Sequence, residues 1–464
     1  NNFFDYFCCA SNGKGITSLP AGSFDTSGIK GVSTKFFSFF NTNGQLTSLP
    51  AGSFDISGIT RAQNNFFSYF NNNGKLTSLP AGSFDTSNIT NVGGNFFDCF
   101  NKSGQLTSLP AGSFDISGIT SAQSEFFNDF NNGGKLTSLP TGSFDTSNIT
   151  SVQDYFFGNF NRYGELTSLP AGSFDTSNIT SIGESGFSGF NQGGKLTSLP
   201  AGSFDISNIT LERGNFFALF NSGGELTSLP DGSFRLNSDL GATKVLSNGF
   251  FAGFNGGSST ARGKLTSLPD GSFDTSHITR AWIGFFNGFN HYGNLTSLPV
   301  GSFNTSNISG EIADGFFKEF NANGRLTSLP AGSFDTSHIT KSGSGFLYSF
   351  NSSGALTSLP AGSFNTDSMV QVWDNYCSHF NYHGELTALP AGSFGCSNVT
   401  STNPNNTPFY NFNNSSGKLE KDTTNYNPDF FNPYTADVTA YYWSGSYTTS
   451  STITPGSPFY YKTA

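Results

Sequence analysis

The sequence predicts an α/β solenoid with a parallel β-sheet on one face, short helices on the other, and a small β-rich C-terminal tail. A motif of the form Leu-Thr-Ser-Leu-Pro recurs along the chain at intervals of about 30 residues. Each interval also carries a turn signal and a cluster of Phe residues. One such interval cannot bury its own apolar side chains, whereas stacked copies can, which is the condition for a solenoid.

Thirteen repeats are recognised, and the first residue of each motif is taken as repeat position 1. They start at Ile16, Leu46, Leu76, Leu106, Leu136, Leu166, Leu196, Leu226, Leu265, Leu295, Leu326, Leu356 and Leu386. The array covers residues 1–400, residues 401–419 form a degenerate last repeat, and residues 420–464 form a tail rich in Thr, Ser and Tyr. Because repeats stack into one elongated body, we expect one array and a tail instead of several globular domains.

The Leu-Thr-Ser-Leu segment is predicted to be a short strand, because a β-branched Thr lies between apolar residues and Pro follows. Pro-Ala-Gly, as in Pro110-Ala111-Gly112, fits a type I turn with Pro second and Gly fourth. Repeat position 13 is Asn, Gly or His, and the tolerance of these residues for positive φ predicts a left-handed residue there. The chain should leave the sheet at the turn.

A short helix is predicted around the Phe residues of each repeat. Thr150 and Gln153 have the spacing of a capping box, and Phe at repeat positions 21, 22 and 25 has helical spacing. Gly at position 29 would then lie just past the helix end. The interior of the second unit is expected to contain Leu46, Leu49, Phe54, Ile59, Phe66, Phe67 and Phe70.

Asn recurs at repeat position 26, beside a Phe that should be buried. We expect a ladder in which each amide bonds to the backbone of the next turn, since buried polar groups need partners. Position 30 alternates in charge, as in Lys135, Glu165 and Lys195, which would stabilise the register of neighbouring turns.

Composition excludes several function classes. Only 11% of the 464 residues are charged, while the chain has 54 Phe and 56 Gly, so the surface must consist mainly of Asn, Ser, Thr and Gly. The net charge of −10 argues against nucleic acid or an anionic membrane as a partner, because both attract clustered Lys and Arg. No run of 18 apolar residues occurs, so we expect no membrane insertion of the numbered chain. Because the chain begins inside a repeat, we expect it to be a mature or partial product.

Two constellations could bind metal, and each has a structural alternative. Asp at position 10, as in Asp55 and Asp85, could form a ladder that holds Ca²⁺. The alternative, which we favour, is a turn in which Asp bonds the backbone two residues on, because Arg235 and Gly395 replace Asp without breaking the repeat.

The second constellation is the group Asp374, Cys377, His379 and His383, which could ligate Zn²⁺. Cys377 occupies an interior Phe position, so we expect its side chain to point away from the His residues. A Cys377–Cys396 disulfide is a further possibility, since the two lie in successive units. We therefore expect neither a metal nor another cofactor. Uniform repetition offers no catalytic group of unlike residues, so we expect no enzyme.

The departures from the repeat are the candidate functional residues. An insertion between Leu226 and Leu265 contains a Gly/Ser-rich loop, and such loops in solenoids often lie on the working face. The alternative is a tolerated slip of the repeat that has no role. Its candidate binding residues are Gly256, Gly257, Ser258, Ser259, Thr260 and Arg262. Residues 437–443 and 447–453 should form a hairpin that either caps the array or pairs with another chain. The apolar N-terminus and this hairpin supply the candidate assembly residues Phe3, Phe4, Tyr6, Phe7, Tyr441, Tyr442 and Trp443.

The phrase Leu-Thr-Ser-Leu, followed by Ser-Phe-Asp-Thr-Ser-Asn-Ile-Thr and an aromatic segment, resembles the BspA-type leucine-rich repeat of bacterial and protist surface proteins. The resemblance covers residues 1 to about 400, although this unit is several residues longer and Phe replaces the family's Met or Cys. It implies a right-handed leucine-rich solenoid, extracellular or on the cell surface. The expected function is adhesion or ligand binding, with a host or neighbouring-cell surface protein or glycan as partner. The alternative is a structural subunit that assembles head to tail into a homo-oligomeric extracellular filament.

Overall fold

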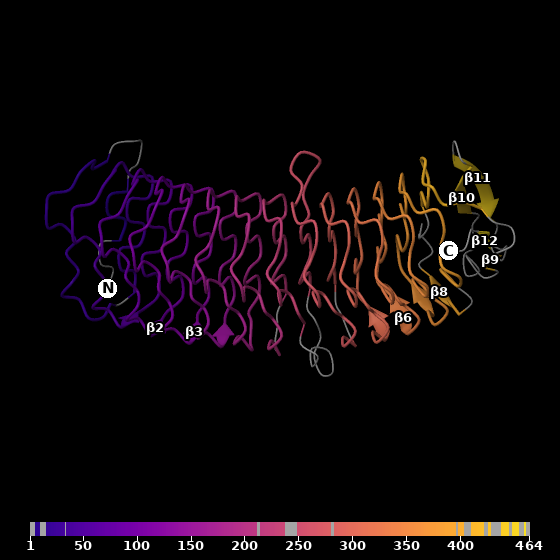
Figure 1. Ribbon diagram of the computed structural model, residues 1–464, viewed down its shortest axis with the longest axis horizontal. Helices are drawn as coiled ribbons and strands as arrows, with labels where there is room; N and C mark the ends of the chain where they lie inside the picture. The colour runs from indigo at the N-terminus through magenta and orange to yellow at the C-terminus, as the bar shows by residue number, and fades with distance from the viewer. Residues whose placement is uncertain are drawn as a thin grey trace. The chain divides into compact units, whose positions relative to one another are not determined.

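In each part of the computed structural model, successive turns of the repeat lie side by side (Figure 1). The chain divides into two units, Asn1–Ser233 and Phe234–Ala464. The described residues are 5–9, 15–32, 34–210, 214–236, 248–279, 283–395, 398–402, 410–421, 426–427, 438–444, 448–453 and 459–460. They contain twelve strands and no helix. Parallel strands in small sheets are confirmed, whereas the predicted row of short helices is wrong.

The strands of the repeats lie just after the Ile-Thr pair, at about repeat position 16, and all of their pairings are parallel. The first unit has two pairs, β1 (Arg61–Ala62) with β2 (Asn91–Val92) and β3 (Ser121–Ala122) with β4 (Ser151–Val152). The second unit has one four-stranded sheet of β5 (Gly310–Ile312), β6 (Ile339–Ser342), β7 (Gln371–Val372) and β8 (Ser401–Thr402).

The Leu-Thr-Ser-Leu segment is not a strand, and a side chain explains why. The N–H of Leu76 donates to Oδ1 of Asn71 at 3.2 Å, and Nδ2 of Asn71 donates to the carbonyl of Leu76 at 3.3 Å. Both backbone groups of the Leu are therefore used within one turn and cannot join a ladder. Adjacent turns keep one bond in this segment, from the N–H of Thr77 to the carbonyl of Thr47 at 3.2 Å.

The turn after this segment is type II, not the predicted type I. Ser53 donates its N–H to the carbonyl of Pro50 at 3.3 Å, which places Gly52 third in the turn. Gly52 has φ +80°, the value that a type II turn requires at its third residue. Glycine is needed here for its conformation, and Pro is the first residue of the turn instead of the second.

Left-handed residues alternate along the segment that was predicted to be helical. In the second repeat Asn65, Tyr69, Asn71 and Asn73 all have φ between +50° and +59°. An α-helix needs right-handed φ at every residue, so this backbone cannot form the i to i−4 bonds of a helix. Its N–H groups reach other turns instead: Asn71 donates backward to Phe40 at 2.9 Å and Tyr69 donates forward to Asp98 at 2.7 Å. No helix forms because neighbouring turns supply the partners.

Repeat position 13 is not left-handed, which corrects the prediction for this position. Among the described residues there, Asn88 and Asn148 do not have positive φ. Nδ2 of Asn88 donates to the carbonyl of Ser57 in the preceding turn at 2.8 Å. Asn is favoured at this position by a side-chain bond. A left-handed residue lies four positions earlier, at the Phe of position 9, such as Phe54 with φ +59°.

Phenylalanine rings fill the interior of both units. Phe70 stacks on Phe100 of the next turn, with centroids 5.3 Å apart, while Phe54 meets Phe70 edge to face at 5.5 Å. Stacking between turns and edge contacts within them are both favoured arrangements of aromatic pairs. The predicted interior residues of the second repeat are buried, except that Leu49 is half-buried.

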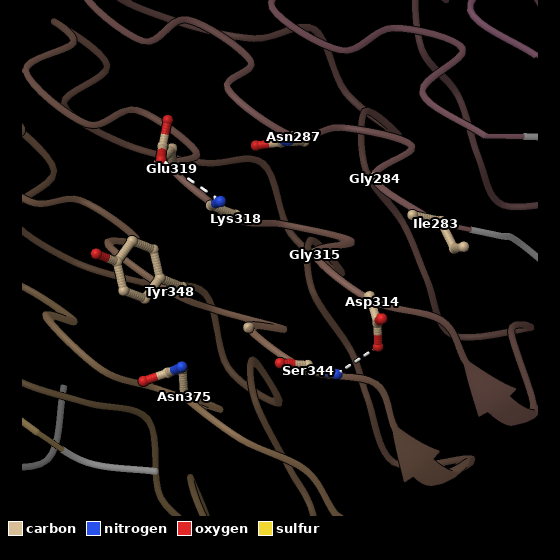
Figure 2. Close-up of a pocket in the computed structure, with 11 residues that line it drawn as sticks. Ile283, Gly284, Asn287, Asp314, Gly315, Lys318, Glu319, Ser344, Tyr348 and Asn375 are labelled. Atoms are coloured by element: carbon tan, nitrogen blue, oxygen red, sulfur yellow. Dashed lines mark hydrogen bonds and ion pairs between the residues drawn. The ribbon is translucent and has the colours of Figure 1, made fainter. Parts of the chain in front are cut away.

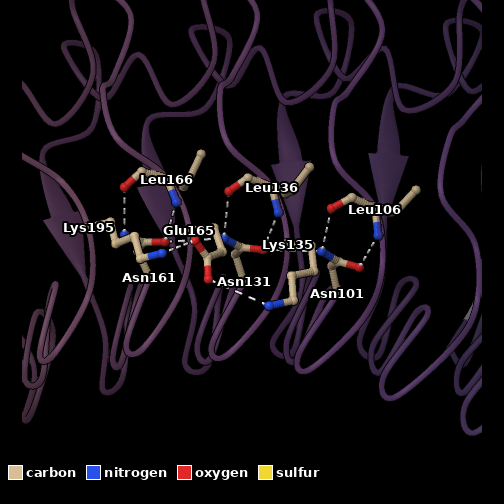
Figure 3. A network of polar contacts seen from close by, with 9 residues as sticks. All are labelled: Asn101, Leu106, Asn131, Lys135, Leu136, Asn161, Glu165, Leu166 and Lys195. Atoms are coloured by element: carbon tan, nitrogen blue, oxygen red, sulfur yellow. Dashed lines mark hydrogen bonds and ion pairs between the residues drawn. The ribbon is translucent and has the colours of Figure 1, made fainter.

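The predicted Asn ladder is present, with different partners (Figure 3). Nδ2 of Asn131 donates to Oδ1 of Asn161 at 3.1 Å and to the carbonyl of Leu136 at 3.3 Å. The ladder therefore joins side chain to side chain between turns, and side chain to backbone within a turn. Gly134 packs against it: a Cβ there would lie 2.3 Å from Oδ1 of Asn131. This close approach, not a helix end, requires Gly at position 29.

The exposed charges also follow the repeat. Glu165 contacts Lys135 at 3.5 Å and pairs with Lys195 on its other side (Figure 3), as predicted from the alternating signs. The Asp of position 10 makes the predicted turn, because Oδ1 of Asp55 accepts the N–H of Ser57 at 3.1 Å. Asn304 makes the same contact with Ser306 at 3.1 Å, which explains why Asn can replace Asp.

The tail contains the predicted hairpin, in which β10 (Val438–Trp443) pairs antiparallel with β11 (Thr448–Ile453). A second antiparallel pair joins β9 (Tyr426–Asn427) and β12 (Phe459–Tyr460). The last rung of the Asn ladder, Asn413, donates from Nδ2 to the carbonyl of Tyr441 at 2.9 Å. The hairpin therefore supplies the partner that a further repeat would otherwise provide. No helix in the described part of the chain has the length and apolar character needed to cross a bilayer.

Candidate ligand-binding groove

A row of glycines distinguishes the second unit from the first. The residue directly before the aromatic pair, which is Phe-Phe in two of these repeats and Phe346-Leu347 in the third, is Gly284, Gly315 and Gly345 in three successive repeats of the second unit. Their φ values are +61°, +64° and +64°. In the first unit the same left-handed place holds larger residues, such as Asn95 with φ +52° and Tyr155 with φ +55°. The backbone is therefore shared by both units, and these three repeats of the second unit lack a side chain at this place.

The missing side chains leave a hollow of about 560 Å³ over four successive turns (Figure 2). This volume lies within the range of small-molecule sites, roughly 300–1,000 Å³. The lining residues come from the same face of each turn: Ile283, Gly284, Asn287, Asp314, Gly315, Lys318, Glu319, Ser344, Gly345, Tyr348 and Asn375. A floor of glycine lets a ligand approach the backbone closely.

The charges in the groove are already engaged with protein groups. Oδ1 of Asp314 accepts the N–H of Ser344 at 2.6 Å. Lys318 lies 3.9 Å from Glu319 and 5.4 Å from the ring centre of Tyr348. Lys318 thus has a carboxylate and an aromatic ring as neighbours within the groove (Figure 2).

Glu319 also faces His291, whose Nδ1 lies 3.5 Å from Oε2 of the carboxylate. Burial lowers the pKa of His291, and the nearby carboxylate of Glu319 opposes this shift only in part. The carboxylate of Glu319 therefore has two basic neighbours, Lys318 and His291.

Aromatic residues continue from one end of the groove. Tyr348 contacts His379 edge to face at 5.5 Å, and His379 contacts Tyr410 at 5.4 Å. Nε2 of His379 lies 3.1 Å from Nδ2 of Asn411, and burial lowers the pKa of this His. Tyr410 is 58% exposed. The end of the groove thus presents aromatic surface to solvent.

The predicted binding loop is a small bridge-closed loop that stands out from the row of turns (Figure 1). Gly257 and Arg262 form an antiparallel bridge, and Gly256 accepts the N–H of Gly263 at 2.8 Å. Ser258, Ser259 and Thr260 are exposed at its tip, whereas Gly256 is buried.

Arg262 is not a free ligand-binding group at the loop tip. Its Nη1 donates to the carbonyl of Asn323 at 2.9 Å, and its guanidinium lies 5.6 Å from the ring centre of Tyr292. Tyr292 in turn contacts His291, the partner of Glu319 in the groove. The loop is therefore tied to the groove wall through consecutive contacts, and it flanks the groove without lining it.

The candidate assembly residues occupy different surroundings. Tyr6 is 58% exposed and stacks on Phe39 at 4.4 Å, while Phe7 is half-buried. Phe3 and Phe4 lie outside the described residues. In β10, Tyr442 is buried, Tyr441 is half-buried, and Trp443 is described only in its backbone.

The structure separates the Cys and His residues of the candidate zinc group. Cys377 is buried in the interior, as expected. His379 contacts Asn411, and His383, which is exposed, contacts Ser416. Within the described part of the chain, no three His, Cys, Asp or Glu residues are placed to hold a metal ion. Cys396 lies outside the described residues, so its pairing is not described.

Sequence reasoning placed function at the Gly/Ser-rich loop and at the chain ends, and none of these residues lines the groove. The groove includes Ile283 and Gly284, at positions 19 and 20, but its wall residues Asn287, Lys318 and Tyr348 come from the middle of the supposed helix. Gly before the aromatic pair in consecutive repeats was the available signal. This signal was missed because the segment was expected to be a helix, in which these glycines and the wall residues would not share one exposed face.

The stacked turns, with ladders of Asn, Phe and charge, define a solenoid repeat protein. Residues 30–163 match the sequence family described as "Mycoplasma protein of unknown function, DUF285". Together with the repeat geometry, this match supports the BspA-type leucine-rich repeat resemblance that the motif indicates.

Two solved structures show a loose likeness. A leucine-rich repeat protein from Bacteroides ovatus ATCC 8483 is 13% identical, covers 74% of this chain and 82% of its own, and has a TM-score of 0.33. A leucine-rich repeat protein from Eubacterium ventriosum ATCC 27560 is 17% identical, covers 64% of this chain and 84% of its own, and has a TM-score of 0.16. No curated protein matches the chain. The repeat assignment rests on the contacts between turns of this chain.

Proposed function

We propose that the chain is a non-catalytic adhesion protein, extracellular or on the cell surface, that binds its ligand in the groove of the second unit. The row Gly284, Gly315 and Gly345 carries this proposal. The Phe residues that follow each glycine are as buried as in the first unit, so the core gains nothing from the change. A hollow that the core does not require is a candidate for ligand binding.

A catalytic role has little support in the groove. Asp314 is held by a backbone N–H, and Lys318, Glu319 and His291 contact one another or a ring. None of these groups is paired with a Ser, Thr or Cys in the way that a nucleophile and its base require. These residues fit ligand binding better than catalysis.

The experiment fills the groove without changing the backbone. In the double variant Gly315→Asn and Gly345→Asn, each glycine receives the residue that already occupies this left-handed place at Asn65, Asn95 and Asn375. Binding of the full chain to host-type cells, matrix proteins and glycans should fall at least tenfold, while thermal stability stays close to wild type.

Gly133→Asn is the matched control, because Gly133 has φ +64° in the first unit and Asn73 occupies the same repeat position. This variant should bind as the wild type does. Equal binding by the groove-filled variant would refute the groove as the binding site. Absence of any binding by the wild type across all three target classes would refute the adhesive function itself.

The filament alternative has weaker support. Head-to-tail assembly needs two complementary open ends, and the last Asn of the ladder is already bonded to Tyr441 of the same chain's hairpin. Sedimentation of the purified chain tests this point. Concentration-dependent polymers would favour the filament over the adhesion protein.

A further inference from the structure

We infer that the groove between Ile283 and Asn375 binds an uncharged saccharide, an inference that rests on the proposed binding function and names its ligand class. Three observations carry it: the balance of charges, the polar groups that remain available, and the aromatic surface at one end.

The charge balance favours a neutral ligand. An anionic ligand would need Lys318, which is held between the carboxylate of Glu319 and the ring of Tyr348. A cationic ligand would need Asp314 or Glu319, which already accept from Ser344 or face Lys318 and His291. A charged ligand group would therefore compete with the existing contacts of Asp314, Lys318 and Glu319. An uncharged ligand leaves these pairs intact.

The polar groups that remain available match hydroxyl groups. Within the described part of the chain, the amide of Asn287 and the hydroxyl of Tyr348 have no hydrogen-bond partner. Asn375 accepts from Ser378 at 3.3 Å through Oδ1, and its amide nitrogen has no partner among the described residues. Amides and phenols both donate and accept, as sugar hydroxyls do. The three residues come from different turns, so they can engage successive hydroxyls of one ligand (Figure 2).

The aromatic surface suits the apolar faces of a sugar ring. Tyr348, His379 and Tyr410 form a continuous set of ring contacts that leads out of the groove. Aromatic side chains with a polar tip combine apolar contact area with hydrogen bonding. A pyranose presents C–H groups on its faces and hydroxyls at its edge, so it can use the rings and the amides together.

The extended form of the groove favours an oligosaccharide over a single sugar. Glycine recurs in three of its four turns, and successive turns are spaced near the strand spacing of about 4.8 Å. In the core of the same turns, the ring centroids of Phe289 and Phe320 are 5.6 Å apart. A ligand with a repeating unit can place equivalent groups on equivalent turns.

The test is a glycan array that contains neutral, sialylated and sulfated oligosaccharides, probed with the full chain. We expect binding to neutral glycans, and a dissociation constant that changes by less than about twofold between about 0.05 and about 0.5 M salt, because no ion pair forms. Tyr348→Ala and Asn287→Leu should each weaken binding at least tenfold. Tyr348→Phe, which keeps the ring, should weaken it less.

Tyr163→Ala is the control, because Tyr163 is an exposed tyrosine of the first unit and lies outside the groove. Selective binding of sialylated or sulfated glycans with steep salt dependence would overturn the inference. Binding of a protein ligand that the groove-filling variant abolishes, without any glycan binding, would overturn the saccharide class and leave the proposed function standing. Folding of each variant is checked by circular dichroism. Absence of glycan binding by the wild type would also count against the inference.

Discussion

Asn131 donates from Nδ2 to Oδ1 of Asn161, which lies 30 residues further along the chain, at 3.1 Å. Asn161 in turn donates to Asn191 at 3.1 Å, and both side chains are fully buried. Each amide also accepts from and donates to the Leu of its own turn. Asn thereby supplies hydrogen-bond partners for the buried backbone groups of Leu and also links neighbouring repeats.

Asn161→Ala should be among the most destabilising single changes in the first unit. It leaves Nδ2 of Asn131, Oδ1 of Asn191 and both backbone groups of Leu166 without their side-chain partner. An unsatisfied buried group costs about 1–3 kcal/mol, so we expect a loss of roughly 3 kcal/mol or more in unfolding free energy. Urea unfolding of the full chain measures it. Asn148→Ala, at an exposed Asn that makes one bond between turns, should cost under about 1 kcal/mol.

Gly134→Ala tests the close approach at the same ladder. The added Cβ would lie 2.3 Å from Oδ1 of Asn131 and 2.4 Å from the carbonyl of Asn101. Both oxygens already accept hydrogen bonds, Oδ1 of Asn131 from the N–H of Leu136 and the carbonyl of Asn101 from the N–H of Gly104, so we expect overpacking to cost about 1–3 kcal/mol or more. Gly28→Ala is the control, because a Cβ there meets nothing within 4 Å. Comparable melting temperatures for the two variants would show that the ladder does not require glycine.

The period, the buried Phe positions and the Asn ladder could be predicted because they depend on side-chain type and spacing alone. Phe54, Phe67 and Phe70 must share an interior whatever the backbone does between them. The strand and helix assignments failed because they depend on where backbone N–H groups find partners. The side chain of Asn71 hydrogen-bonds to the backbone of Leu76, and the N–H of Tyr69 donates to the carbonyl of Asp98 in another turn. Neither contact can be predicted from the sequence of one repeat.

The groove was hidden from sequence reasoning for the same reason. A helix over residues 284–289 would place the aromatic pair and Asn287 on different faces. The alternating left-handed backbone instead puts the Phe residues inside and exposes Asn287 beside Gly284. Once that conformation is known, consecutive glycines before the aromatic pair indicate a hollow directly.

Glu165→Gln should change stability little, although the carboxylate lies between two lysines. The hydrogen bond from Lys195 is the main cause that lowers the pKa of Glu165, but the lysine side chains are 48% and 56% exposed. Solvent and salt screen such pairs, so we expect no more than about 0.5 kcal/mol at physiological ionic strength. Urea unfolding at low and high salt checks this. A loss above about 1 kcal/mol that persists at high salt would assign this charge row a larger role.

Asp98 gives the first unit a pH-dependent stability. Its side chain is 3% exposed, and burial is the main cause that raises its pKa to about 7, with the carboxylates of Glu125 and Asp129 adding to the shift. Hydrogen bonds from Cys99 and from Asn128, whose Nδ2 lies 3.2 Å from Oδ1 of Asp98, oppose it. The pKa of the folded state thus lies above the ordinary value near 4.

The folded chain therefore retains a proton that the unfolded chain releases between about pH 4 and pH 7, and stability must fall as pH rises through this range. The loss is of the order of a few kcal/mol at pH 8. Asp98→Asn keeps an acceptor for Asn128 and removes the ionisation, so it should be more stable than wild type at pH 8 and similar at pH 4. Asp85→Asn is the control, because Asn304 makes the same turn in the second unit. Urea unfolding from pH 4 to pH 8 measures both profiles, and parallel slopes for wild type and Asp98→Asn would rule out Asp98 as their source.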